Sequence, residues 1–594
     1  MRSNSFFLLA AVLAVSGLVW AMPPYQGIQE PEALKAMRLK GMDSPERGLI
    51  FQLREAKGGE AKVTGSRKYP VVMGYFTDLA AINTQAEFQS MLFSNASGAK
   101  SVNNYYRDMS YNAMSCSGKV DEWRSSDNTV AYYSVNYGLN GGTTANTYEF
   151  IRKTLVHADS FVSFADSSYD QNHDGYVDVL WVIHAGKGAE EGASNIWSHS
   201  FYLSGFGSGA TYYTTNDVSP FTGNYVRINE YIINPERTNY ADGNNSTTEM
   251  IGCGVFCHEF GHALGLPDLY DTDDSDPGIG RWSVMAGGSW GANGNTGARP
   301  AALDVWCRRF LGWAAPTKVT NDGQYTVNSI MATNAGSSYK LGKLGADSVK
   351  QFWLVENRYK NAPGPVSSVR WDSLLYGQGL LIYHIDSTYT TTTYLSDKTV
   401  NASDTRPYGV AVEETDMTSA GYSSELYNGT NQGDAADAWN SGTQAVFDSI
   451  GASYPVSYYN GANSTTGGAH SLVAIRAIPA ASAAMTCSMF VGVAPAGVAG
   501  RPEEGIPAAF ALQNAWPNPA RGQVNFSYQL PQAARVEIRV YNVLGHEVKH
   551  FLLGVQGAGQ HSVRWNDDRI AEGVYFVRLQ AGEHQATRKF IVVK

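Results

Sequence analysis

The stretch that most constrains this chain is GVFCHEFGHALGLPDLYD, residues 254–271. His258 and His262 stand four apart, so on a helix they project from one face, a single turn apart. Neutral imidazoles at this separation can both reach one Zn²⁺ at about 2.0–2.1 Å. Gly265 suits a left-handed helix end, and the chain must then reverse to bring a third ligand, Asp268, to the same ion. The stretch therefore predicts a helix, a tight reversal and a metal site in one unit.

Neighbouring residues extend this prediction. Ser246 and Glu249 fit a capping box, which predicts a helix running from there through Leu264. Glu259 lies beside the two histidines, placed to hold a water rather than the metal. Met285, in WSVMAGGSW, follows where a methionine-containing turn would form the floor beneath the ion. The alternative is a helix whose histidines pack in a core, but this would leave several buried polar groups needing partners.

The length of 594 residues is too great for a single core, and the sequence changes character along the chain. Residues 66–315 alternate strand-like and helical patterns, which predicts an α/β domain. Residues 316–490 carry short apolar runs between turns and no clear helix, as in a β-sandwich-like domain. Residues 491–512 are rich in Ala, Gly and Pro and predict a linker. Residues 513–594 alternate cleanly, which predicts a small antiparallel sandwich with one core.

Three segments of the α/β region have well-defined patterns. QAEFQSMLF (85–93) and TYEFIRKTLVHADSFV (147–162) have helical spacing of apolar residues. VDVLWVIHAG (177–186) is a continuous apolar run ending in glycine, which suits a strand buried on both faces.

The N-terminus, residues 1–21, has the layout of a signal peptide. Arg2 precedes a short apolar core, and cleavage is expected after Ala21. The alternative, a membrane anchor, needs about 20 apolar residues, which this run does not supply. No other stretch is long and apolar enough to span a bilayer, so the mature protein is expected to be secreted, extracellular or attached to the cell surface. Residues 22–65 are then either a propeptide or an exposed arm, and they contain no cysteine that could occupy the zinc.

The net charge argues against nucleic acid as a partner, and the cysteine count limits disulfide pairing. A net charge of −10 gives no sustained basic surface, so nucleic acid is not an expected partner. The five cysteines are an odd number, so at least one is unpaired. Cys253 and Cys257 lie one helical turn apart, and we expect them to be buried as small apolar side chains rather than to form a metal pair.

A second metal site is predicted in the loop YDQNHDGYVD, residues 169–178. Oxygen ligands at alternate positions with a glycine at the sixth are how a short loop binds Ca²⁺. The expected calcium ligands are the side chains of Asp170, Asn172, Asp174 and Asp178 and the carbonyl of Tyr176. The twelfth position departs from the EF-hand pattern, because Trp181 replaces the bidentate glutamate. The alternative is a solvated turn rich in Asx residues.

The metal motif and several later segments resemble the immune inhibitor A family of secreted bacterial zinc metallopeptidases, relatives of the metzincins. The matching segments are GVFCHEFGHALGLPDLYD, WSVMAGGSW, VDVLWVIHAG, NIWSH (195–199), PAALDVWCRRFLGW (300–313), FWLVENRYK (352–360) and GLLIYHID (379–386). The resemblance implies zinc on His258, His262 and Asp268, with Glu259 as general base. Related enzymes often have histidine at the third ligand position.

The resemblance implies a secreted zinc-dependent endopeptidase that hydrolyses peptide bonds of proteins or peptides. Zinc lowers the pKa of its bound water, and Glu259 would take the proton and pass it to the departing amine. An additional oxyanion donor is expected, for which His184 and His199 are candidates, although a structural role is the stronger expectation for both. One alternative is an inactive, metal-stabilised adhesion or binding protein, and another is a zinc hydrolase of a different bond.

The C-terminal module resembles sorting domains of the type IX secretion pathway and the related flagellar-hook-cap immunoglobulin-like modules. The segments that carry this resemblance are NAWPNPARG (514–522), YNVLGHEV (541–548), GVYFVRL (573–579) and TRKFIVVK at the end. It implies that the module interacts with secretion machinery and directs export across an outer membrane. The alternative is an appended sandwich without such a role.

Overall fold

The computed structural model describes residues 48–57, 61–238, 249–271, 276–291, 297–342, 350–391, 408–416, 431–448, 473–491, 510–531, 534–556, 559–567 and 570–593, with the shorter pieces 33, 37, 42, 395, 400–401 and 426. The predicted signal peptide and residues 492–509 of the predicted linker lie outside these ranges. The chain divides into two compact units, Met1–Ser449 with Ser453–Gly492, and Ile450–Ala452 with Val493–Lys594. Within the described part of the chain, no helix is long and apolar enough to cross a membrane.

The first unit contains a five-stranded sheet with the order β2-β1-β3-β7-β4. Its strands are β1 (Gly65–Tyr75), β2 (Met114–Ser125), β3 (Leu180–Lys187), β4 (His199–Tyr202) and β7 (Glu230–Arg237). The first four strands of that order run parallel, and β4 pairs antiparallel with β7 at the edge. The predicted buried strand is β3, whose first seven residues are all buried.

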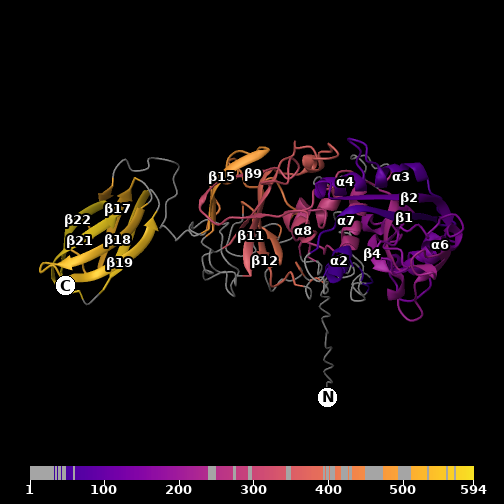
Figure 1. Cartoon of the computed structure of the whole chain (residues 1–594), viewed down its shortest axis with the longest axis horizontal. Coiled ribbons are helices and arrows are strands. Elements are labelled where there is room, and N and C mark those ends of the chain that lie inside the picture. Colours follow the sequence, from indigo (N-terminus) through magenta and orange to yellow (C-terminus); the bar gives the residue numbers. More distant parts are fainter. Residues whose placement is uncertain are drawn as a thin grey trace, which may run out of the picture. The chain divides into compact units, whose positions relative to one another are not determined.

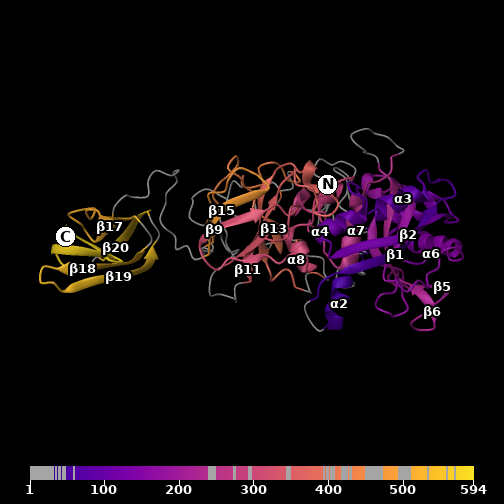
Figure 2. The same cartoon turned by 45° about the horizontal axis from the view of Figure 1, so that its top comes forward.

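Helices cover both faces of this sheet. They are α3 (Gln85–Phe93), α4 (Val102–Met109), α6 (Thr147–Ala158) and α7 (Cys253–Leu264). The helix predicted over 85–93 is confirmed as α3, and the one predicted over 147–162 is confirmed as α6 up to Ala158, beyond which the chain turns. On β1, Tyr69 packs against Phe260 of α7, whereas Gly74 faces Phe150 of α6. Because residues an odd number apart point to opposite faces of a strand, α6 and α7 lie on opposite sides of the sheet (Figures 1 and 2).

The N-terminus of α7 differs from the predicted one. The helix begins at Cys253 with Gly252 as its N-cap, not at Ser246, which lies outside the described residues. The approach to α7 is extended, because Thr238 N–H donates to Glu249 O and Ile251 N–H donates to Glu236 O, both at 3.1 Å. These bonds continue the edge of β7 instead of allowing Glu249 to close a capping box.

Shorter elements complete this region. They are α2 (Leu49–Lys57), α5 (Val130–Tyr133), the antiparallel pair β5 (Tyr213–Val218) and β6 (Tyr225–Ile228), η6 (Gly280–Trp282), η7 (Gly287–Trp290) and α8 (Val305–Phe310).

Two further sheets follow in the same unit. One has the order β13-β12-β11-β10-β8, with β8 (Thr317–Lys318), β10 (Ser338–Leu341), β11 (Gln351–Arg358), β12 (Gly379–Asp386) and β13 (Val410–Val412). The other contains β14 (Ala474–Arg476), β15 (Ala484–Phe490) and β9 (Gly323–Asn328). Trp353 and Met485 belong to a core that the two sheets share. Leu354 instead joins the core of the α/β region, so the chain after residue 315 packs directly on the first sheet's domain.

The second unit is built from two antiparallel sheets around a core of its own. They contain β16 (Ala511–Leu512), β17 (Gln523–Leu530) and β20 (Gly559–Asn566), and β19 (Glu547–Gln556), β18 (Ala534–Asn542), β21 (Gly573–Ala581) and β22 (His584–Val592). The predicted alternation holds, since Val536, Ile538 and Val540 are buried between less buried neighbours.

Candidate metal centre

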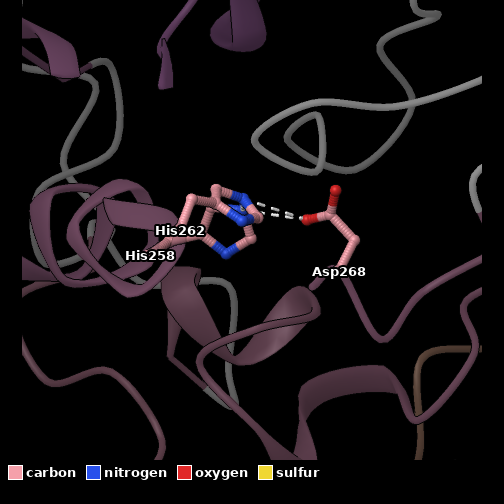
Figure 3. Close-up of side chains that lie close together, drawn as sticks. All are labelled: His258, His262 and Asp268. Atoms are coloured by element: carbon pink, nitrogen blue, oxygen red, sulfur yellow. Dashed lines mark hydrogen bonds and ion pairs between the residues drawn. The ribbon is translucent and has the colours of Figure 1, made fainter. Parts of the chain in front are cut away.

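Three side chains converge at the C-terminal end of α7. His258 and His262 project from the last turns of the helix, and Asp268 approaches from the segment that follows it (Figure 3). The two Nε2 atoms are 3.2 Å apart, and each lies 3.3 Å from Oδ1 of Asp268. Tetrahedral ligands with bonds of about 2.0–2.1 Å lie roughly 3.3–3.4 Å from one another. The three atoms therefore have the spacing that one zinc ion requires.

Backbone carbonyls fix both imidazoles with Nε2 directed at this point. His258 Nδ1 lies 2.8 Å from the carbonyl of Val284, and His262 Nδ1 lies 2.9 Å from the carbonyl of Leu266. A carbonyl only accepts, so each Nδ1 carries the proton and each Nε2 presents a lone pair. Two lone pairs and a carboxylate oxygen facing one another in a buried site require a cation between them. The donor set of two imidazoles and one carboxylate suits zinc.

The electrostatics of Asp268 agree with this arrangement. Burial by itself raises the pKa of this carboxyl, whereas a positive charge on His262 and His258, or on a cation bound between them, lowers the pKa well below its usual range. Asp268 is therefore held as an anion, the form that binds metal.

The reversal after α7 depends on glycine. Gly265 caps the helix with a φ of 103°, in the left-handed region that glycine adopts without strain. Its N–H donates to the carbonyl of His262, and Leu266 N–H donates to that of Gly261. This is the predicted tight turn, and it explains how a ligand only six residues beyond His262 can reach the same ion.

Met285 packs against α7 at Gly261. A Cβ added to Gly261 would lie 2.4 Å from Sδ of Met285, so the methionine packs directly on the helix backbone between the two histidines and the turn. The carbonyl of Met285 accepts from Leu269 N–H at 2.8 Å, one residue past Asp268. Glu259 is fully buried on α7, next to His258.

A cavity of about 30 Å³ adjoins His262. It is lined by Gly48, Leu49, Gln52, Tyr69, Asp178, Val179, Ser200, Phe201, Tyr202, Glu230, Tyr231, His262 and Ala263. Residues of α2 thus form part of its wall. Gly48 packs so closely on the cap of α7 that an added Cβ would lie 2.2 Å from Cα of Gly265.

The two other candidate histidines lie apart from the three-ligand group. His199 is buried, with Nδ1 at 2.7 Å from the carbonyl of Trp197 and Nε2 at 2.8 Å from the hydroxyl of Tyr231. His184 is buried, and burial lowers its pKa to about 4. Both are buried in the sheet domain, and a structural role for them stays an expectation.

The predicted calcium loop is closed by its own carboxylates. Asp170 accepts from the N–H groups of Asp174 and Gly175, and Asp178 accepts from that of Gln171. Asp174 also accepts from Tyr176 N–H, and Asn172 donates to Asp174. Burial raises the pKa of Asp178 to about 7. Within the described part of the chain, the carboxylates of Asp170, Asp174 and Asp178 are not among the groups whose oxygens all lie within 4.8 Å of one another.

The fold also brings together three acidic residues that the sequence pattern did not predict as a group. Glu414, Asp416 and Asp437 bring carboxylate oxygens within 4.8 Å of one another. Glu414 and Asp437 are buried and Asp416 is exposed. Two separate loops supply them, and no regular spacing links residue 414 to residue 437. The five cysteines are all free and buried, which confirms the expectation for Cys253 and Cys257.

Comparison with known proteins identifies two regions of the chain. Residues 77–315 match the catalytic domain of the immune inhibitor A peptidase M6 family. Residues 514–593 match the secretion system C-terminal sorting domain. Residues 77–315 are an M6 immune inhibitor A peptidase domain. The resemblance read from the metal motif and the C-terminal segments is thereby confirmed, and the catalytic region belongs to a metallopeptidase family.

Two curated relatives match part of the chain. The chain is 31% identical over 277 residues to the pre-pro-metalloprotease PrtV of Vibrio cholerae, covering 42% of this chain and 28% of the relative. It is 31% identical over 239 residues to immune inhibitor A of Bacillus thuringiensis subsp. alesti, covering 35% and 31% respectively. The match thus spans less than a third of the length of either relative.

A solved structure of PorZ, a surface component of the type-IX secretion system of Porphyromonas gingivalis, matches with a TM-score of 0.13 and 15% identity. The match covers 21% of this chain and 15% of PorZ, and a likeness this low carries no argument.

Proposed function

We propose that this protein is a secreted zinc-dependent endopeptidase with a metzincin-like catalytic domain. The observation that carries the proposal is the buried triangle of His258, His262 and Asp268, whose 3.2–3.3 Å spacing fits one tetrahedral zinc ion. Among the described residues these three side chains form the group, so we propose that water takes the fourth position. An open position is the mark of a catalytic rather than a structural zinc site.

Zinc bound there would polarise the scissile carbonyl and lower the pKa of a water at the open position. With that water in place, Glu259 would accept its proton as general base and return it to the departing amine. It lies next to His258 on α7 and is buried, so little bulk water competes for the proton. His258 and His262 stay neutral with the metal-facing nitrogen unprotonated, because Val284 and Leu266 hold the proton on Nδ1.

The substrate class follows from the edge of the sheet. Within the described strands, β4 is the terminal strand and pairs only with β7. Ser200, Phe201 and Tyr202 of β4 line the same cavity as His262. An extended peptide can add to such an edge by main-chain hydrogen bonds, which favours a protein or peptide substrate over another hydrolysable bond.

A catalytically inactive adhesion or binding protein is the competing function. A scaffold that only binds has no need of a carboxylate next to the metal ligands, so the presence of Glu259 favours the peptidase.

The test is digestion of a denatured protein mixture by the purified chain, with and without a zinc chelator, followed by sequencing of the fragments. We expect internal cleavage that the chelator abolishes. Glu259→Gln should retain zinc and lose hydrolysis by several orders of magnitude, about 10³-fold or more, since the ligands are intact but the base is gone. Normal casein digestion by this variant would remove Glu259 from the mechanism.

We further propose Ca²⁺ as a structural ion held by Asp170, Asn172, Asp174, Asp178 and the carbonyl of Tyr176. The support is a sharp turn with Gly175 at a φ of 85° and two carboxylates, Asp170 and Asp178, turned inward on the loop. A chelator that spares zinc should lower the melting temperature, and an unchanged melting curve would remove this ion from the account.

Export is proposed to use both ends of the chain. Residues 1–21 act as the signal peptide, and the sorting domain of residues 514–593 engages secretion machinery for passage across an outer membrane. The domain boundaries at 66–315, 316–490, 491–512 and 513–594 stay proposals, as does a propeptide role for residues 22–65.

A further inference from the structure

Residues 282–285 form the segment that we call the floor segment. Its backbone carbonyls hydrogen-bond to one proposed metal ligand, His258, and to the residue that follows another, Asp268. Val284 O accepts the Nδ1 proton of His258 at 2.8 Å. Met285 O accepts from the N–H of Leu269, the residue after Asp268. A shift of this segment would therefore turn the His258 ring and displace the chain that carries Asp268.

The floor segment is in turn held by an arginine of the later β region. Arg358, the last residue of β11, is fully buried, and its Nη1 donates to the carbonyl of Trp282 at 2.7 Å. Its Nε and Nη2 donate to the two carboxylate oxygens of Asp372 at 2.7 and 2.6 Å. A planar guanidinium clamped on both oxygens of a carboxylate has little freedom to turn. The direction of the bond to Trp282 is therefore fixed by Asp372.

A purely structural role for Arg358 is the competing explanation, because it belongs to a buried charge network. Glu356 lies between two arginines, with Oε2 at 2.8 Å from Nη2 of Arg308 and Oε1 at 3.3 Å from Nη1 of Arg358. Two guanidinium groups thus pair with the two carboxylates of Glu356 and Asp372. Loss of either arginine should destabilise the fold.

Arg308 distinguishes the two explanations, since it is equally buried and shares Glu356. Its other bonds go to the hydroxyl of Tyr111 at 2.8 Å and the carbonyl of Leu303 at 3.1 Å. None of the hydrogen bonds described for Arg308 reaches the floor segment. The chain thus supplies its own matched control.

We propose that Arg358 is a positioning residue of the metal centre, holding the floor segment through Trp282 so that His258 presents Nε2 to the ion. This inference rests on the proposed zinc-dependent function. Arg358 and Asp372 both belong to the chain after residue 315. If Arg358 has this role, the β region that follows the α/β region helps to position the metal ligands.

The experiment compares Arg358→Lys with Arg308→Lys in the full-length protein. Each change keeps a buried positive charge and removes the planar fork. Zinc affinity is measured by competition with a chromophoric chelator, and ligand geometry by the visible spectrum of the Co²⁺-substituted protein. We expect both variants to melt at lower temperature, but only Arg358→Lys to bind zinc about 10- to 100-fold more weakly and to shift the Co²⁺ spectrum. Equal zinc affinity in the two variants, or a wild-type spectrum for Arg358→Lys, would overturn the proposal.

Asp372→Asn provides a second variant should Arg358→Lys not fold. It leaves the arginine in place but weakens the clamp, so zinc affinity should fall in the same direction. Wild-type affinity in Asp372→Asn would contradict the role of the clamp. If the wild-type chain itself binds no zinc, the proposed function fails first, and this inference falls with it.

Discussion

Glu190 couples the ionisation of a single buried carboxyl group to the stability of the sheet domain. Burial raises its pKa to about 7, and the hydroxyl and N–H of Ser198, which donate to it, limit the rise. In the unfolded chain its pKa is about 4.3. Between these two values the folded state binds a proton that the unfolded state has lost, so this contribution to stability falls as the pH rises through that window, by up to about 1.4 kcal/mol per pH unit.

Glu190→Gln should therefore remove part of the loss of stability between about pH 5 and pH 7. The measurement is the melting temperature of the full chain at both pH values. Glu87→Gln is the control, because capping hydrogen bonds to Thr84 lower the pKa of exposed Glu87, so this carboxyl stays ionised from pH 5 to pH 7 and its substitution should leave the pH dependence in that window unchanged. An identical pH dependence in wild type and Glu190→Gln would show that this carboxyl group does not titrate as described.

At the residue scale, the sequence predicts the three side chains that the fold brings together but not the groups that orient them. The spacing of His258, His262 and Asp268 is local, so one helix and one turn explain it. The carbonyl of Val284 that orients His258 lies 26 residues away, and only the packing of the floor segment beneath α7 brings it there. Arg358 is 76 residues from Trp282, and the sequence pattern of neither segment predicts the hydrogen bond between them.

At the element scale, α2 is the segment that approaches the metal centre from outside the catalytic sheet. Its N-terminal neighbour Gly48 has no room for a side chain against Gly265. Gly48→Ala should lift α2 away from the end of α7 and widen the cavity beside His262. If residues 22–65 act as a propeptide, the uncleaved variant should hydrolyse a peptide substrate faster than the uncleaved wild type.

Gly323→Ala is the matched control for this change. The nearest atom to a Cβ added there is 3.8 Å away, so the substitution meets no obstacle. A Gly48→Ala protein with wild-type activity and wild-type stability would indicate that α2 is an arm without influence on the site.

Element boundaries show where local patterns fail. The Ser246 and Glu249 pair has the chemistry of a capping box, yet Glu249 pairs with Thr238 in an extended strand-like approach. Tertiary hydrogen bonding to the edge of β7 outweighs the local signal. The end of α7 at Gly265 was predictable, because the left-handed conformation there is a property of glycine itself.

At the scale of the whole molecule, composition and periodicity predict the order of α/β, β and terminal sandwich regions. They do not predict that the chain after residue 315 shares a core with the catalytic sheet, as Leu354 and Tyr383 do. Such contacts join residues hundreds of positions apart. The alternation of apolar residues in a strand predicts which face is buried, but it does not identify the element that packs on that face. The sorting domain has a separate core, consistent with its self-contained alternation.

The most direct test of the account is the metal content of the purified full-length protein and of its His262→Ala variant. Elemental analysis should find one zinc per wild-type chain, and the variant should lose most of it, because two ligands cannot hold the ion as three do. Absence of zinc from the wild type, or full retention in His262→Ala, would contradict the assignment of the metal centre and the peptidase function that depends on it.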